Sequence, residues 1–493
     1  MSGSLLAVGL DATDLARLLA WADSGALPVL SRALMGHRGR VASPAHVGSG
    51  AVWPTFTSQR PVTEHGFCSD WAWLPDEMRV ARAHPPADRP GWAAWPGAGL
   101  RGLVVDVPFA PAARVDGVAE ILDWGGHDWL GDPTVIWPAS LRTVVDEAGV
   151  HGFTTSSIAI DGPTDWPLLQ ALAEEASAGA AARGRLVRGA LARHPADVAL
   201  VVFPELHRAG HFLCHLDRPD HPALVGADRP PRELRDAFRR VAAAVDAAVG
   251  TILDAMTPPA RLVLFALHGM HDAHGVVDLL PSLLESRGFS VRRPPARRGA
   301  GDWLSLAARL AKQAVPAPLK RQYYRVAPRS VTTRLAQPPS SEVAYDWSRT
   351  RAFSWPSDQH GWIRVSLAGR ERDGAVPRDA YGSVCDALVN CLTGLVTVSG
   401  APVVERVVRV ADENGGTPPA TLPDLVVHWT PHAVTPGARL AGTDAPIPVI
   451  VRRITGEHAS DGWYAVEGDD PGWPECVDAA ALLATLTRLA ARP

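Results

Sequence analysis

Lysine is almost absent from this 493-residue chain, and cysteine is scarce. Lys312 and Lys320 are the only lysines, so arginine supplies nearly all of the 48 basic residues. Together with abundant alanine, glycine and proline, this bias is typical of GC-rich codon usage rather than of a phosphate-binding device. The five cysteines are scattered, show no CxxC spacing and cannot all pair, which indicates a reducing compartment.

Long hydrophobic runs are also missing. No window approaches the roughly 18 uninterrupted apolar residues that cross a bilayer. The first apolar run, residues 5–10, has no basic residue before it and is broken by Asp11, so it is a poor signal peptide. The net charge of −4 and the pI near 6.5 do not indicate a nucleic-acid polymer or a membrane as partner. We therefore expect a cytoplasmic protein; the sequence does not indicate an oligomeric state.

Short, continuously apolar runs predict buried parallel strands covered by helices on both faces. The length allows one large domain with insertions or two to three ordinary domains. We predict an α/β fold with a largely parallel central sheet, in which residues 1–285 and 345–493 form one catalytic domain. An Arg- and Pro-rich segment, 286–344, is predicted to form an inserted cap or lid. The four runs lie at residues 5–10, 103–107, 198–203 and 262–266.

Ser49 is the first candidate for chemistry. The small residues 48–51 lead directly into an apolar stretch, 52–56, which contains Pro54, so Ser49 should stand at the start of a short helix. A hydroxyl there can attack phosphorus or sulfur while free backbone N–H groups and the helix dipole hold the anionic group. The alternative is that Ser49 only caps the helix.

Asp11 is the second candidate, because it directly follows the first predicted strand. Ligands of open parallel sheets collect beyond the carboxyl ends of the strands. The alternative is that Asp11, or Asp14 after it, caps a helix at residues 15–22.

Histidines gather after the third and fourth predicted strands. His207 and His211 are spaced i and i+4, so on a helix both imidazoles face one way, as two ligands of one metal ion require. His268 follows the next strand, and His458 lies in a later loop. A metal site is favoured over buried core histidines because each buried imidazole needs its own partner. Other potential ligands in these two segments are Glu205, His215, Asp217, His271, Asp272 and His274.

Eight motifs in the expected order give the chain a resemblance to the alkaline phosphatase superfamily, in its branch of type I phosphodiesterases and nucleotide pyrophosphatases. The motifs are GLDATD, LPVLSRAL, SGAVWPTF ahead of RPVTEHG, LVVDVP, ELHRAGH, ALHGM, HGWIRVSLAGRE and GEHASDGW. The resemblance implies an alkaline-phosphatase-like sandwich and a hydrolase that cleaves a phosphodiester or related phosphoryl ester of a small anionic substrate.

The resemblance also implies roles for individual residues. Ser49 would be the nucleophile, transiently phosphorylated, and would also bind metal. Asp11 and His268 would belong to the metal site nearest Ser49, and His207, His211 and His458 to the other; Glu205, Asp272 and His360 are further candidates. Zinc is the ion expected from such histidine-rich ligation, with manganese or another divalent ion as alternatives.

Two departures from the family bear on the metal count. His207 stands where the family usually has an aspartate, and Leu267-His268 stands where it has an Asp-His pair. Either a dianionic substrate balances the charge, or Glu205 or Asp272 joins the ligands, or only the three-histidine site is filled. The alternatives for function are a tailoring phosphomonoesterase, mutase or transferase, or a non-catalytic binding protein on a degenerate hydrolase fold.

Overall fold

The structure is a computed structural model in which the chain divides into two compact units, each described below by itself. The first unit comprises Met1–Cys68, His84–Ala273 and Arg453–Pro493, and the second comprises Ser69–Ala83 and His274–Arg452. The residues that the structure describes are 4–125, 134–149, 151, 160, 162–218, 220–224, 227–273, 279–293, 345–357, 359–430, 438–440, 454–468 and 472–491.

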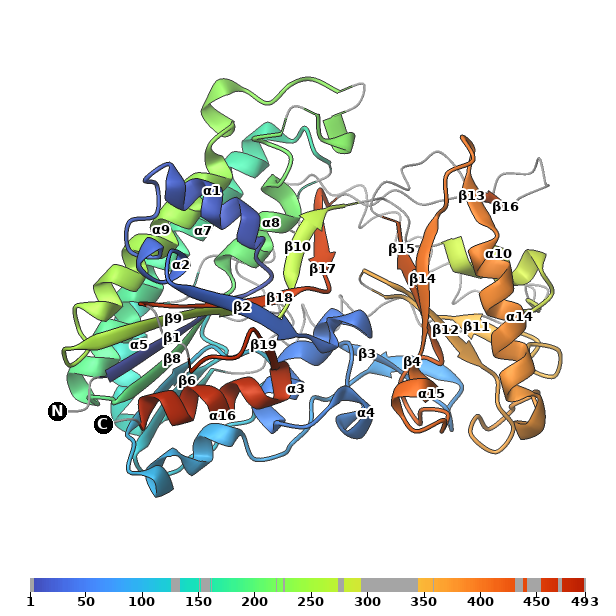
Figure 1. The fold of residues 1–493 in the computed structure, drawn as a ribbon, viewed down its shortest axis with the longest axis horizontal. Helices are drawn as coiled ribbons and strands as arrows, with labels where there is room; N and C mark the ends of the chain where they lie inside the picture. The colour runs from blue at the N-terminus through green and yellow to red at the C-terminus, as the bar shows by residue number, and fades with distance from the viewer. Residues whose placement is uncertain are drawn as a thin grey trace, which may run out of the picture. The chain divides into compact units, whose positions relative to one another are not determined.

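A nine-stranded sheet forms the centre of the first unit (Figure 1). Strands β9, β1, β8, β5 and β6 lie side by side and are mutually parallel, while β18 runs antiparallel between β9 and β2. In spatial order the strands are β19 (Cys476–Asp478), β2 (His37–Ala42), β18 (Gly462–Val466), β9 (Ala260–Ala266), β1 (Ser4–Leu10), β8 (Val198–Phe203), β5 (Gly102–Val105), β6 (Val118–Leu122) and β7 (Val135–Trp137).

The central strands are continuously apolar because both of their faces are buried. Alternate residues of β1 belong to two different hydrophobic cores: Leu10 packs in one, and Leu5 packs in the other. The same alternation holds in β8 and β9, which explains why the sequence shows no polar face in these strands.

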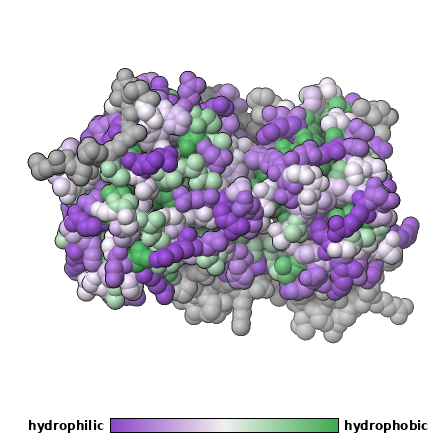
Figure 2. Space-filling model, turned by 60° about the horizontal axis from the view of Figure 1, so that its bottom comes forward, coloured by the Kyte–Doolittle hydropathy of each residue, from purple (hydrophilic) through white to green (hydrophobic). Residues whose placement is uncertain are grey.

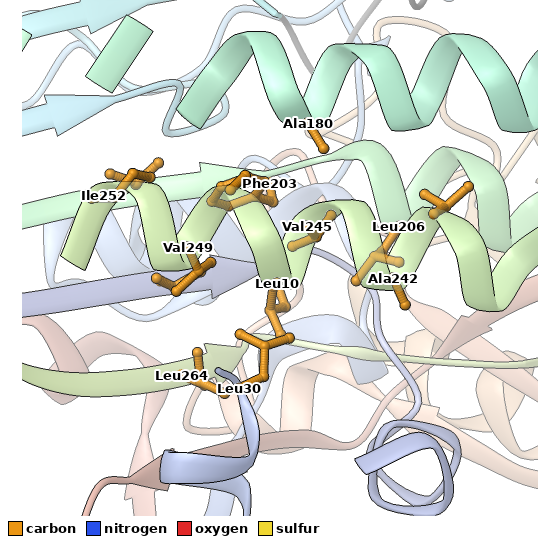
Figure 3. Close-up of a cluster of buried hydrophobic side chains, with 14 of the residues drawn as sticks. Leu10, Leu30, Ala180, Phe203, Leu206, Ala242, Val245, Val249, Ile252 and Leu264 are labelled. Carbon is orange, nitrogen blue, oxygen red and sulfur yellow. The ribbon is translucent and has the colours of Figure 1, made fainter. Parts of the chain in front are cut away.

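Helices cover both faces of this sheet (Figure 1). On one face, Val245 and Val249 of α9 pack over Leu10 and Phe203 of the sheet (Figure 3). The helices that contribute to this core are α1 (Leu15–Asp23), α2 (Ser31–Leu34), α5 (Arg142–Ala148), α7 (Trp166–Arg193), α8 (Glu205–Leu213) and α9 (Ala237–Leu253). The opposite core is covered by α3 (Val52–Ser58) and α16 (Ala479–Ala490), and α4 (Val62–His65) follows α3.

The second unit has its own four-stranded antiparallel sheet and its own hydrophobic core. The sheet order is β11 (Ala352–Ser354), β12 (Gly361–Val365), β15 (Leu425–Trp429) and β14 (Val404–Arg409), with α10 (Leu279–Ser286) and α14 (Tyr381–Thr393) contributing to the core. The remaining elements are α15 (Val410–Glu413) and the strand pairs β3 (Trp71–Leu74) with β4 (Arg79–Arg82) and β13 (Leu395–Thr397) with β16 (Ala438–Leu440).

The larger segment of the second unit, His274–Arg452, lies in the sequence between two strands that pair with each other in the first unit. Strand β10 (Gly269–Asp272) leads toward it, β17 (Gly456–Ala459) returns from it, and the two are antiparallel, with Met270 opposite His458. The prediction of an α/β fold with a largely parallel sheet and helices on both faces is confirmed. Most of the predicted cap, 286–344, lies outside the described residues, so the cap stays a prediction.

The visible surface in Figure 2 is mixed, with polar and charged side chains spread among small apolar patches. In the described part of the chain, none of the helices combines the length and the apolar character that a membrane crossing needs.

Candidate active site

Several polar residues collect at the carboxyl edge of the parallel sheet. Asp11 follows β1 directly, helix α8 begins two residues after β8, and His268 lies two residues after β9. Because these three strands are parallel neighbours, their carboxyl ends meet at one edge, where ligands of α/β sheets bind.

Three imidazoles converge at this edge. The Nε2 atom of His207 lies 2.9 Å from Nε2 of His211 and 2.7 Å from Nε2 of His458. The ligand atoms of these three residues all lie within 4.8 Å of one another. The His268 ring lies 4.7 Å from the His458 ring, measured between centroids. The structure thus brings together histidines from α8, β17 and the end of β9.

Hydrogen bonds to two of these histidines fix which ring nitrogen carries a lone pair. His207 Nδ1 donates to Asp11 Oδ2 at 2.6 Å, and His211 Nδ1 donates to the Gly456 carbonyl oxygen at 2.8 Å. A carboxylate and a carbonyl can only accept, so Nδ1 is protonated in both rings and the neutral form of each has its lone pair on Nε2. These lone pairs point at each other, which is repulsive unless a cation lies among them.

Helix α8 and strand β17 are held together by backbone contacts as well as by this ring contact. The Thr455 N–H donates to the His211 carbonyl oxygen at 2.7 Å. Gly456 permits the close approach, because a Cβ atom there would clash with the Gly210 carbonyl oxygen and lie 2.8 Å from Cys214 Sγ. Burial raises the pKa of the Cys214 thiol to about 12, so this packed sulfur stays protonated.

Asp11 is buried and accepts two hydrogen bonds. Besides His207, the indole Nε1 of Trp53 donates to Asp11 Oδ1 at 2.9 Å. His268 Nε2 lies 3.7 Å from the same Oδ1. The alternative that Asp11 or Asp14 caps a helix holds for Asp14, which caps α1 by accepting from the N–H groups of Ala16 and Arg17.

Ser49 begins a 3₁₀ turn, Ser49–Ala51, that continues into α3. Trp53, the second residue of α3, follows Ser49 by four residues, and its indole N–H donates to Asp11. Pro54 is tolerated because it is the third residue of α3, where its missing N–H would have no intrahelical partner. The Ala51 N–H donates to the Gly48 carbonyl, so that amide is used within the turn.

Glu205 belongs to a buried ionic cluster that the sequence did not reveal. Its Oε1 atom is 3.0 Å from Nε of Arg183 and 3.0 Å from Nε2 of His151. Arg183 also pairs with Asp106, whose carboxylate accepts from the Trp124 and Gly125 N–H groups. Burial raises the pKa of the Glu205 carboxyl, but Arg183 and His151 together hold that pKa below its usual value. This cluster therefore anchors the first residue of α8.

Asp272 and the histidines after α8 form a second polar cluster. Asp272 pairs with Arg218 at 2.9 Å, and His221 Nε2 donates to the Thr455 carbonyl. His215 contacts the Thr455 hydroxyl and the Pro163 carbonyl, and burial lowers its pKa to about 4. This cluster fixes the chain segment that enters β17.

The remaining candidates are distributed as follows. Asp217 pairs with Arg17, and His271 donates to the Asp272 carbonyl. His360 belongs to the second unit, where its ring centroid lies 3.9 Å from that of His428. His274 lies outside the described residues.

The donor set fits a divalent transition metal. Three imidazole nitrogens with a carboxylate behind one of them form a carboxylate–histidine–metal arrangement, and three protein ligands leave one position open. Imidazole suits zinc, copper, iron and nickel, whereas magnesium and calcium prefer oxygen.

Comparison with known proteins gives a fold. No protein-family model and no curated protein matches the chain. Phosphonoacetate hydrolase from Sinorhizobium meliloti 1021, solved in complex with phosphonoacetate, is similar with a TM-score of 0.51 and 14% identity over 99% of this chain and 96% of that chain. The complex of the same protein with phosphonoformate gives a TM-score of 0.50 and 13% identity, with the same coverage of both chains. Murine ectonucleotide pyrophosphatase/phosphodiesterase 5 is similar with a TM-score of 0.45 and 10% identity, over 99% of this chain and 96% of that chain. The alkaline-phosphatase-like fold class is confirmed, and the sequence resemblance is borne out at the level of fold.

Proposed function

We propose that this protein is a metal-dependent hydrolase that cleaves a phosphodiester or a related phosphoryl ester of a small anionic substrate through a covalent intermediate on Ser49. The observation that carries the proposal is the convergence of His207, His211 and His458 at the carboxyl edge of the sheet, beside Asp11. The Trp53–Asp11 hydrogen bond ties the helix that follows Ser49 to the same edge.

The proposed hydrolysis has two steps, in which residues of this chain bind the ion and attack phosphorus. When bound, a divalent ion would polarise a phosphoryl oxygen and favour the ionised form of a hydroxyl close to it. His207, His211 and His458 would hold the ion. The Ser49 oxygen forms a bond to phosphorus while the bond to the leaving alcohol breaks, and that alcohol takes up a proton. Water then attacks phosphorus, the bond to Ser49 breaks, and the serine regains its proton.

Hydrolysis of bis(p-nitrophenyl) phosphate tests this proposal. Purified protein loaded with zinc should release p-nitrophenol, and Ser49→Ala should abolish the release while Ser58→Ala should not. Ser58 is a matched control because it ends the same helix and its hydroxyl donates to the Pro54 carbonyl. Quenched parent enzyme should also carry a phosphoryl adduct on Ser49 by mass spectrometry. If Ser49→Ala turns over as fast as the parent, Ser49 is not the nucleophile.

Assays of the parent and of these variants with several substrates decide between the substrate classes. Phosphodiesters, p-nitrophenyl phosphate as a monoester, and phosphonoacetate should be assayed in parallel, the last because a protein of the same fold is a phosphonoacetate hydrolase. Removal of metal by a chelator should abolish each Ser49-dependent activity, and zinc should restore it. Protein that binds no stoichiometric metal after reconstitution would favour the non-catalytic alternative.

A further inference from the structure

We infer that Asp11 is a positioning residue for His207 rather than a metal ligand, and that the site holds a single ion on His207, His211 and His458. From the proposed function, this inference takes only the premise that the protein binds a metal ion. It replaces the two-ion arrangement, in which Asp11 binds an ion directly, with one centre of three nitrogens and an open position.

The first argument is the way in which the Asp11 carboxylate is used. Each of its oxygens accepts from an N–H group: Oδ1 from the indole of Trp53 at 2.9 Å and Oδ2 from His207 Nδ1 at 2.6 Å. The short second bond is typical of a charge-assisted pair. A carboxylate in this position holds the tautomer and orientation of a ligating imidazole and raises its basicity.

The second argument concerns the side chains that could bind a second ion. Among the residues that the structure describes, Glu205 pairs with Arg183, and Asp272 pairs with Arg218, so both of these carboxylates have arginine partners. Leu267, the neighbour of His268, is an apolar residue packed in the core on the α3 side of the sheet. A second ion would then rest on Asp11, His268 and Ser49, a set in which Asp11 is the one carboxylate.

The third argument is charge. Two divalent ions would bring four positive charges to a buried edge at which Asp11 is the carboxylate in contact with the histidines. Uncompensated charge is costly in a poorly solvated site, because the local dielectric constant is far below that of water. One ion beside one carboxylate leaves a single net charge, which a phosphoryl anion can neutralise.

Metal stoichiometry and affinity test this inference without any substrate. Metal-free protein is reloaded with Zn²⁺ or Co²⁺, the bound metal is measured by elemental analysis, and the Kd is measured by competition with a chromophoric chelator. The parent should bind one ion per chain. Asp11→Asn should also bind one ion, with a Kd weaker by about 10- to 100-fold, and its Co²⁺ absorption bands should be unchanged because the three nitrogens remain.

Two further variants control the measurement. Asp14→Asn changes a nearby carboxylate that caps α1, so it should lower stability slightly and leave the Kd unchanged. His211→Ala should abolish stoichiometric binding. If Asp11→Asn does not fold, the parent's stoichiometry and Co²⁺ spectrum still decide the single-ion statement.

Each of three results would overturn the inference while leaving the metal dependence in place. They are two ions per parent chain, a Kd that Asp11→Asn leaves unchanged, and altered Co²⁺ bands in Asp11→Asn. Two ions together with Ser49-dependent hydrolysis would overturn this inference alone. Activity that survives Ser49→Ala, with one ion bound, would overturn only the proposed nucleophile. A parent that binds no ion would overturn both the inference and the metal dependence.

Discussion

Replacing Gly456 by alanine should damage the candidate metal centre without removing a ligand. Gly456 is the first residue of β17, two residues before His458. A Cβ atom at this position would clash with the Gly210 carbonyl oxygen and lie 2.9 Å from its carbonyl carbon, whereas ordinary contacts are 3.4–4 Å. The carbonyl carbon and oxygen of Gly210 are backbone atoms of α8, which cannot rotate aside as a side chain can. Strand β17 and helix α8 must therefore separate by roughly 1 Å.

The expected loss of stability follows from the contacts between α8 and the start of β17. Overpacking costs about 1–3 kcal/mol, and weakening a hydrogen bond costs about 0.5–1.5 kcal/mol. Two of the hydrogen bonds at the junction run from the Thr455 N–H to the His211 carbonyl and from His211 Nδ1 to the Gly456 carbonyl. We expect the free energy of unfolding to fall by about 2–6 kcal/mol. A ligand displaced by about 1 Å should reduce hydrolysis by about 100-fold even with excess zinc.

Urea unfolding and zinc-dependent hydrolysis measure the two effects separately. Gly97→Ala is the matched control, because Gly97 lies in the same unit and a Cβ there meets nothing within 4 Å. If Gly456→Ala matches the control in stability and in activity, then α8 and β17 do not pack as closely as described, and the reasoning about His458 fails.

Two further predictions concern the clusters beside the site. Arg183→Met should lower the free energy of unfolding by about 3–5 kcal/mol, because it leaves the carboxylates of Asp106 and Glu205 buried without their cation. Urea unfolding measures this loss, and a value below about 1 kcal/mol, which is typical of a surface ion pair, would contradict a buried cluster. For His215, the folded pKa of about 4 lies below the unfolded value of 6.5, so its stabilising effect is complete above pH 6.5 and is lost as pH falls toward 4. The cost of His215→Asn should accordingly shrink by about 2–3 kcal/mol between about pH 7.5 and pH 4.5, whereas a cost that is constant with pH would show that His215 is not buried as a neutral ring.

The strands near the site could be predicted because they are buried on both faces. The apolar run 198–203 coincides with β8, and the run 262–266 lies within β9. The i, i+4 spacing of His207 and His211 also carried real information, because α8 places both rings against His458. A pattern of this kind is local, so one sequence is enough to show it.

Features that depend on distant partners could not be predicted. The segment with His271 and Asp272 is polar and shows no local strand pattern, and it forms β10 because its backbone pairs with β17, far along the chain. Similarly, the β3–β4 pair and the 3₁₀ segment Gly91–Ala98 lie in a stretch rich in tryptophan, proline and charge, which shows no local pattern of a strand. The Arg183 partner of Glu205 lies in the middle of a long helix, where the sequence gives no sign of burial.

The position of β18 in the sheet has a consequence for biosynthesis. Strand β2, made early, is separated from β9 by β18, which the ribosome makes more than 400 residues later. A nascent chain that stops before residue 456 has an open strand edge on β9 and lacks the third imidazole. The proposed ion can therefore bind all three histidines only after residue 458 has been made, and until β18 follows, β9 keeps an unpaired edge that can associate with other chains.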